Sequence, residues 1–214
     1  PLDAYSRPKR GGIIAIKLRE GDELVDVAVT KRGDEIVLAT ATGIEPPTGF
    51  VSVLNGGAPP FAVTAPTRLA TDGQFVYLVG QKPGGVLHIE RRSLANFGLS
   101  AVFTSNGPLT VIDTMRSPVN DTVLVLATVS APGITVAGRP IPYTNTSATQ
   151  GNVVLLRIDT SGQPLTVSTW DLSGDQRAVG FAHSENPGIV AEQRVVIIGN
   201  QGSDAFIWSV LHPL

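Results

Sequence analysis

Short runs of aliphatic and β-branched residues, each bounded by glycine, proline, asparagine or aspartate, fill almost the whole chain. Runs of this length between turn-forming residues are typical of β-strands. The chain has 23 glycines and 16 prolines, and no long window keeps the helical period of about 3.6 residues without one of them. Residues 91–100 come nearest to a helix and are too few. The sequence therefore predicts an all-β fold.

The predicted strands span nearly the full length of the chain. They are 12–18, 24–30, 35–42, 50–54, 60–64, 67–71, 74–80, 85–91, 99–104, 109–115, 122–130, 152–159, 165–170, 177–183, 193–199 and 204–211.

The strands form a repeat. A turn followed by two strands recurs from about residues 34, 72, 121 and 192, with a further strand before each start. A four-strand unit with a period of roughly 40–50 residues is the signature of a propeller blade. The last unit lacks its fourth strand, and residues 12–18 form a spare strand ahead of the first unit.

We therefore expect a single-domain β-propeller of about four four-stranded antiparallel blades. In this arrangement residues 12–18 pair beside residues 204–211 in the last blade, which closes the ring and removes two exposed sheet edges. An open array, or a fragment of a larger ring, is the alternative.

Composition excludes several classes of protein. Only 16% of the residues are charged and the mean hydropathy is +0.17, which excludes a wholly disordered chain. No apolar run approaches the ~18 residues that a membrane-spanning helix needs, so no membrane span is predicted. Cysteine is absent, so a disulfide framework and a thiolate metal site are excluded.

Charge is concentrated in residues 1–43, which hold seven basic and seven acidic residues. Basic side chains bind phosphate by charge neutralisation and counterion release, so this segment is the candidate nucleic-acid site. The remaining chain has nine basic and eleven acidic residues, and the net charge is −2. The candidate nucleic-acid-binding residues are Arg7, Lys9, Arg10, Lys17, Arg19, Lys31 and Arg32.

Residues 1–43 resemble one blade of the C-terminal domain of the DNA gyrase A protein. The resemblance rests on SRPKRGGIIAI, on the REGDELV turn and on the GDEIVLAT strand. It implies a blade of a six-bladed β-pinwheel that wraps DNA around a basic rim. The sequence departs from that pattern at residues 44–47, Ile-Glu-Pro-Pro, and it lacks the basic gyrase box.

Residues 67–211 resemble bacterial β-propeller repeats of secreted and surface proteins. The resemblance is carried by GITVAGRPIPY, GNVVLLRIDTSGQPLTVSTW, GDQRAVGFAH and QRVVIIGN. It implies a propeller fold and no particular ligand. Within one domain, residues 1–43 are thus gyrase-like and residues 44–214 hold the other repeats. A natural recombinant or a laboratory chimera would explain this combination.

No enzymatic motif is present, and we expect no catalytic activity, no cofactor and no metal. The three histidines (His88, His183 and His212) lie in different units and are interpreted as structural. The acidic turns at residues 34–35, at 72 and 175, and at Asn120-Asp121 are interpreted as hairpin turns rather than calcium sites.

The longest irregular stretch, residues 131–151, is the candidate contact loop, with Arg139, Tyr143 and Asn145 as its contact residues. The sequence thus predicts a non-catalytic binding or scaffold module that contacts an unknown ligand or protein through its loops. The alternative is a DNA-wrapping module of the gyrase type. The compartment stays open: the first resemblance implies a bacterial cytoplasmic protein, and the second implies an extracellular or surface protein.

Overall fold

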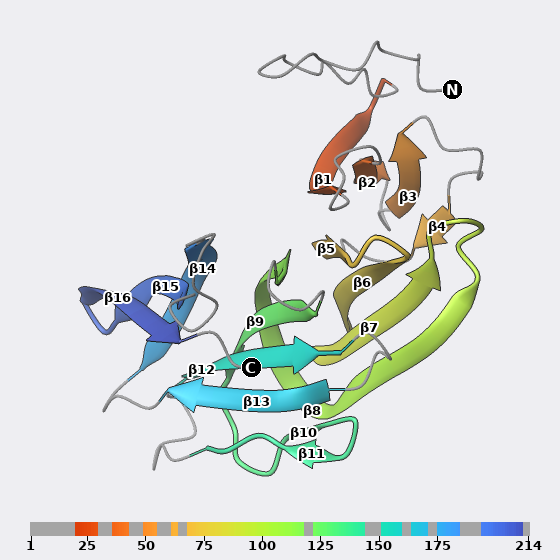
Figure 1. Cartoon of the computed structure of the whole chain (residues 1–214). Coiled ribbons are helices and arrows are strands. Elements are labelled where there is room, and N and C mark those ends of the chain that lie inside the picture. The colour runs from red at the N-terminus through yellow and green to blue at the C-terminus, as the bar shows by residue number, and fades with distance from the viewer. Residues whose placement is uncertain are drawn as a thin grey trace.

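The computed structural model shows an all-β chain. The residues it describes are 20–29, 36–42, 49–54, 61–63, 68–117, 122–143, 151–159, 164–170, 175–184 and 194–211. Every regular element in these ranges is a β-strand (Figure 1), which confirms the prediction of an all-β chain. No helix in the described part of the chain has the length and apolarity needed to cross a membrane.

Three antiparallel sheets contain these strands. The first sheet has the order β1 (Asp22–Val29), β2 (Ile36–Thr42), β3 (Gly49–Leu54) and β4 (Phe61–Val63). The second follows the order β5 (Arg68–Thr71), β6 (Phe75–Lys82), β7 (Val86–Ser93), β8 (Leu99–Arg116), β9 (Val123–Val129), β12 (Asn152–Ile158) and β13 (Pro164–Trp170). The third consists of β14 (Gln176–Ser184), β15 (Arg194–Gln201) and β16 (Asp204–Leu211).

One strand differs from the sequence-based expectation. Residues 99–104 and 109–115 are predicted as separate strands, but β8 runs through both of them, so that prediction is wrong. A register shift against β7 marks a bulge near Ser105. The hydroxyl of Ser105 accepts a hydrogen bond from the Leu87 amide at 3.0 Å, which gives this backbone donor a partner where the strand pairing is interrupted.

The predicted contact loop also differs from expectation, because part of it is ordered as strands. β10 (Thr135–Val136) and β11 (Arg139–Pro140) form a hairpin, and Val136 pairs with Ser105 of β8. The buried side chains of this hairpin belong to the hydrophobic core. They are Ile134, Val136 and Ile141.

The core lies between the sheets and uses both faces of the central strands. All residues of β9 and of β12 are buried. Because side chains alternate along a strand, Val125 of β9 packs in one cluster with Ile89 of β7. The next residue, Leu126, packs in another cluster with Ile197 of β15. These strands are therefore buried on both faces and mostly apolar, with Thr128, Asn152 and Arg157 as their buried polar residues.

Three apolar clusters join four successive groups of strands. The groups are β1–β4, then β5 to the first half of β8, then the second half of β8 with β9, β12 and β13, and finally β14–β16. The first cluster joins the β1–β4 sheet to one face of β5 and β6. The second joins the other face of β6 and β7 to β9 and β12. The third joins the opposite face of β9 and β12 to the β14–β16 sheet. Each group of strands is thus covered by its neighbours along the chain.

The first strand of each group lies beside the first strand of the next. β1 packs against β5, β5 packs against β8, and β8 packs against β14. Among the described strands no sheet closes on itself, and β16 pairs with β15 alone. The predicted partner of β16, residues 12–18, lies outside the described residues.

Leu126→Ala should remove much of the packing between the second and third sheets. The side chain is fully buried, so we expect the free energy of unfolding to fall by about 2–5 kcal/mol. Urea titration followed by circular dichroism measures this loss. The control Val102→Ala removes a side chain that is 45% exposed and should change the free energy by less than about 0.5 kcal/mol. Equal losses would contradict the two-sided core.

Candidate functional site

The predicted nucleic-acid-binding residues lie outside the described part of the chain. This holds for all seven of them: Arg7, Lys9, Arg10, Lys17, Arg19, Lys31 and Arg32. Their role stays a prediction. In residues 20–29 of the same segment, Glu20 and Glu23 are exposed acidic side chains.

The nine basic residues that follow residue 43 all lie in described ranges. Several are held by their own neighbours: the Arg91 guanidinium lies 3.5 Å from the ring centroid of Phe75, and Arg177 pairs with Asp175 at 2.9 Å. The other exposed basic side chains lie on four different strands. They are Arg68, Lys82, Arg139 and Arg194. Within the described ranges, the basic residues therefore provide no perimeter for wrapped DNA.

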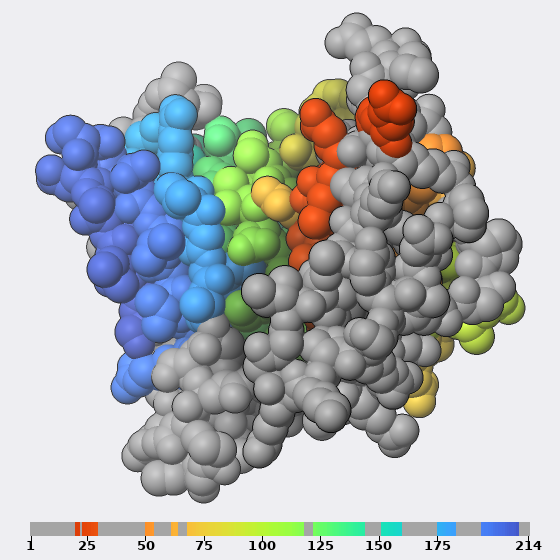
Figure 2. Space-filling view, turned by 90° about the horizontal axis from the view of Figure 1, so that it is seen from above, coloured from red at the N-terminus to blue at the C-terminus, as the bar shows by residue number. Residues whose placement is uncertain are grey.

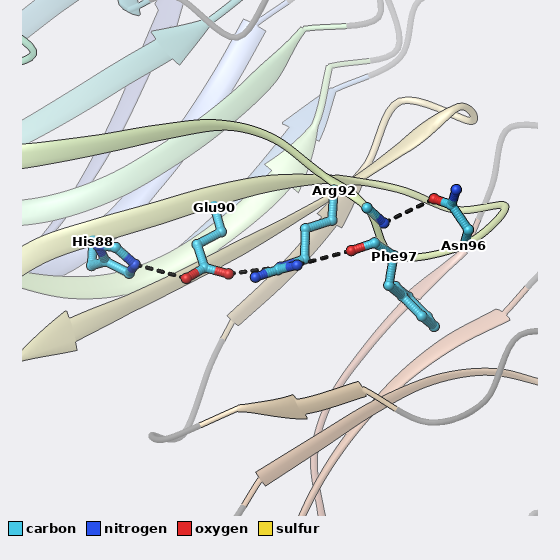
Figure 3. A network of polar contacts seen from close by, with 6 residues as sticks. His88, Glu90, Arg92, Asn96 and Phe97 are labelled. Carbon is cyan, nitrogen blue, oxygen red and sulfur yellow. Dashed lines mark hydrogen bonds and ion pairs between the residues drawn. The ribbon is translucent and has the colours of Figure 1, made fainter.

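A row of polar side chains follows one face of β7. Alternation along the strand places His88, Glu90 and Arg92 on this face. His88 Nε2 lies 2.9 Å from Glu90 Oε1, and Arg92 Nε donates to Glu90 Oε2 at 2.7 Å (Figure 3). Arg92 Nη1 also donates to the carbonyl of Phe97 at 2.8 Å.

This row also ties two sheets together. The Arg92 guanidinium lies 3.9 Å from the centroid of the Phe61 ring on β4, a cation–π contact between the first and second sheets. The Phe61 ring in turn lies 6.2 Å from the ring of Phe97. Arg92, which is paired with Glu90, thus holds the turn after β7 against the first sheet. The structural role of His88 stays a prediction.

Two opposing effects set the pKa of Glu90. Burial favours the neutral acid, but the hydrogen bonds and charges of His88 and Arg92 favour the carboxylate more strongly. The net result is a pKa below the ordinary glutamate value. The carboxylate is therefore the form that holds this row together at neutral pH.

A second set of polar contacts links β1, β5 and β8, which lie side by side. Asp26 Oδ2 on β1 accepts a hydrogen bond from the Leu69 amide on β5 at 2.8 Å. The Thr114 hydroxyl on β8 donates to the Leu69 carbonyl at 2.8 Å. Burial raises the pKa of the neighbouring Asp113, and Asp26 adds to the increase, while the Thr114 amide and Arg68 oppose it. β1, β5 and β8 are thus joined by polar contacts as well as by packing.

The hairpin of the candidate contact loop is anchored rather than free. The Thr135 amide donates to Asn106 Oδ1 at 2.6 Å, and Asn106 Nδ2 donates to the Gly133 carbonyl at 3.1 Å. Arg139 is exposed on β11. Tyr143 is half-buried and packs against the core, and its role in contact stays a prediction. Asn145 lies outside the described residues.

The acidic turns that the structure describes use their carboxylates within the fold. Asp72 Oδ1 accepts hydrogen bonds from the Gln74 and Phe75 amides at 2.9 and 2.8 Å, as an aspartate in a hairpin turn does. Asp175 accepts from the Gly151 amide at 2.9 Å. In the described ranges, no group of three or more His, Cys, Asp or Glu residues is placed to hold a metal ion. These carboxylates thus have structural partners.

Comparison with known proteins identifies the N-terminal segment. A family described as the DNA gyrase C-terminal domain, beta-propeller, matches residues 1–31. The DNA gyrase A protein of Klebsiella oxytoca is 51% identical over 43 residues, and that of Salmonella typhimurium is 48% identical over 42 residues. Each match covers 20% of this chain and 5% of the gyrase protein. The chain thus contains a segment similar to the gyrase A C-terminal domain.

Among solved structures, an acylaminoacyl peptidase of Pyrococcus horikoshii aligns with 89% of this chain and 33% of its own chain. The TM-score is 0.47 and the sequence identity is 8%. This alignment carries no conclusion about the fold or the function of the chain.

Sequence reasoning missed most of the polar contacts between strands. The alternation of His88, Glu90 and Arg92 is visible in the sequence as a period of two, but the contact of Arg92 with Phe61 is not. The hydrogen bond from Leu69 to Asp26 joins residues 43 positions apart. Nothing in the local sequence indicates such a pair.

Glu90→Gln should destabilise the fold in a pH-dependent way. Because the pKa of Glu90 is lowered in the folded state, its carboxylate contributes stability above the ordinary pKa of 4.5. This contribution is lost as the pH falls through the lower folded value. We expect the variant to have a Tm roughly 2–4 °C lower near neutral pH, the shift expected for about 1 kcal/mol in a domain of this size.

Thermal unfolding at a series of pH values measures this effect, and the difference between variant and parent should shrink in acid. Glu23→Gln, at an exposed position on β1, is the control. A difference in Tm that stays constant from neutral to strongly acidic pH would rule out the proposed role of the carboxylate.

Proposed function

We propose that the chain is a non-catalytic β-propeller module of about four blades that acts in binding or scaffolding. The observation that carries this proposal is the stacking of sheets through three apolar clusters. The consecutive packing of β1, β5, β8 and β14 supports it further, because propeller blades are arranged around a common axis. In this architecture the rigid stack positions loops for recognition.

The arrangement of ionisable groups supports a non-catalytic role. The carboxylates of Asp26, Asp72 and Asp175 accept hydrogen bonds from backbone amides, and Glu90 is paired with His88 and Arg92. Groups engaged in this way support the fold. The exposed Arg139 on the anchored hairpin is our candidate for contact with a ligand or a partner protein.

We also propose that residues 12–18 supply the fourth strand of the β14–β16 sheet. Support comes from the order of the other units, in which four strands pair in sequence, and from the three strands of the last sheet. The composite character of the sequence, with one gyrase-like unit joined to others, fits a module assembled from exchangeable blades.

Removal of residues 1–18 tests the fourth-strand proposal. We expect the Tm to fall by several degrees, because an unpaired strand edge and part of the core become exposed. Removal of residues 1–11 alone is the control, because it keeps the predicted strand and should leave the Tm close to that of the parent. An unchanged Tm after removal of residues 1–18 would contradict the proposed strand.

The second candidate function is binding of duplex DNA through the gyrase-like segment. It is favoured by the match of residues 1–31 to the gyrase C-terminal domain family and by the basic residues of this segment. The described remainder of the chain adds no basic perimeter, so we expect contact with DNA at one segment rather than wrapping around the molecule.

Gel-shift titration with duplex DNA at low and moderate salt tests this candidate. If the segment binds DNA, the shift should weaken as salt rises. It should also be lost in the triple variant Arg7→Ala, Lys9→Ala, Arg10→Ala. The triple variant Arg68→Ala, Lys82→Ala, Arg194→Ala is the matched control, because it removes the same number of positive charges from exposed positions outside this segment. No shift at low salt with micromolar protein would exclude this function.

A further inference from the structure

The last sheet leaves one of its two faces uncovered. On β15, Val195 and Ile197 point into the cluster shared with β9, whereas Ile198 points to the opposite face and is 44% exposed. Ile207 of β16 pairs directly with Ile198 and is 75% exposed, and Val179 of β14 is 62% exposed. We call Ile198, Ile207 and Val179 the C-terminal end face. Exposed aliphatic residues gathered on one face are a mark of an interaction surface.

The first sheet has an uncovered face of the same kind. On β1, Ala28 belongs to the cluster shared with β5 and β6. The register with β2 places Leu24, Val27 and Val29 on the opposite face, where they are 49%, 46% and 50% exposed. We call these three residues the N-terminal end face.

Inside the molecule, faces equivalent to these two already pack against each other. Each group of strands presents one apolar face to the preceding group and the other to the following group, and this contact occurs three times. Among the described strands, no group precedes the N-terminal end face and none follows the C-terminal end face. A C-terminal end face meeting an N-terminal end face would therefore repeat the internal contact.

The two end faces do not meet within one chain. The first sheet and the β14–β16 sheet lie on opposite sides of the long central sheet in both views (Figures 1 and 2). β1 packs against β5, whereas β14 packs against β8, β9 and β12. All six residues of the end faces stay exposed in this arrangement.

We propose that a second copy of this chain covers these faces. Two chains stack head to tail, with the C-terminal end face of each on the N-terminal end face of the other, so that two equivalent contacts complete one ring. A contact between two different surfaces closes in this way when the rotation between copies permits it. The inference rests on the proposed stacking architecture and moves its closure from one chain to two, so that residues 12–18 of each copy would supply the fourth strand of the β14–β16 sheet of the other copy.

Light scattering during size-exclusion chromatography of the full chain tests the proposal. We expect a mass of twice 22.4 kDa at micromolar concentration. Ile207→Asp removes one end face and Val27→Asp removes the other, so each variant alone should be a monomer. Both side chains are exposed, so each variant should keep the circular dichroism spectrum of the parent. Leu99→Asp, at a position that is 55% exposed on β8, is the control and should remain a dimer.

Mixing the two variants makes the test specific. Ile207→Asp keeps the N-terminal end face and Val27→Asp keeps the C-terminal end face, so the mixture should form a one-to-one dimer through the one intact pair of faces. A parent chain that is monomeric at all concentrations would overturn the proposal, as would a dimer that survives both substitutions. Masses that rise continuously with concentration would overturn the closed pair. The two proposals are distinguished by their readouts: the Tm after removal of residues 1–18 tests the fourth strand, and the mass of the full chain and its variants tests the pairing of the end faces.

Discussion

The fold depends on strands that are buried on both faces. A sheet that faces water on one side needs a second layer on the other side only, whereas β9 and β12 need a layer on each side. Burial of Val125 on one side and Leu126 on the other forces the chain to place further strands both before and after this pair. The successive packing of sheets follows from this requirement, and it leaves the first and last sheets as the places where apolar surface stays open.

Polar contacts set the alignment that apolar packing alone leaves loose. The Leu69 amide is hydrogen-bonded to Asp26 and the Leu69 carbonyl to Thr114, so the backbone of one residue on β5 links β1 and β8. Towards the outer strands, Arg92 joins Glu90 to the Phe61 ring. Directional contacts of this kind fix one register between sheets. The described ionisable groups in these contacts thus help to hold the stack of sheets together.

The strand pattern was predictable because two signals agree in it: β-branched runs and turn residues between them. β9 and β12 are recognised by their runs of consecutive aliphatic residues, 123–127 and 153–156, and β14, β15 and β16 by shorter runs. The predicted break between residues 104 and 109 is wrong because turn propensity is a property of the local sequence, whereas tertiary contacts decide the conformation of this segment. Gly107 leaves room for the Ile134 side chain of the hairpin, and Val136 pairs with Ser105, so a sequence that resembles a turn stays extended. The contact of Arg92 with Phe61 depends on which sheet faces lie together, and residue spacing alone does not give that information.

The continuity of β8 has a consequence for how the molecule comes apart. Its first half pairs with β7 and its second half with β9, so neither neighbour can release the strand without disturbing the other. The two groups of strands that share β8 should lose their structure as a single cooperative unit. The β1–β4 sheet shares no strand with the rest. In evolution, that sheet is the one at this end of the chain that recombination can replace without cutting through a strand.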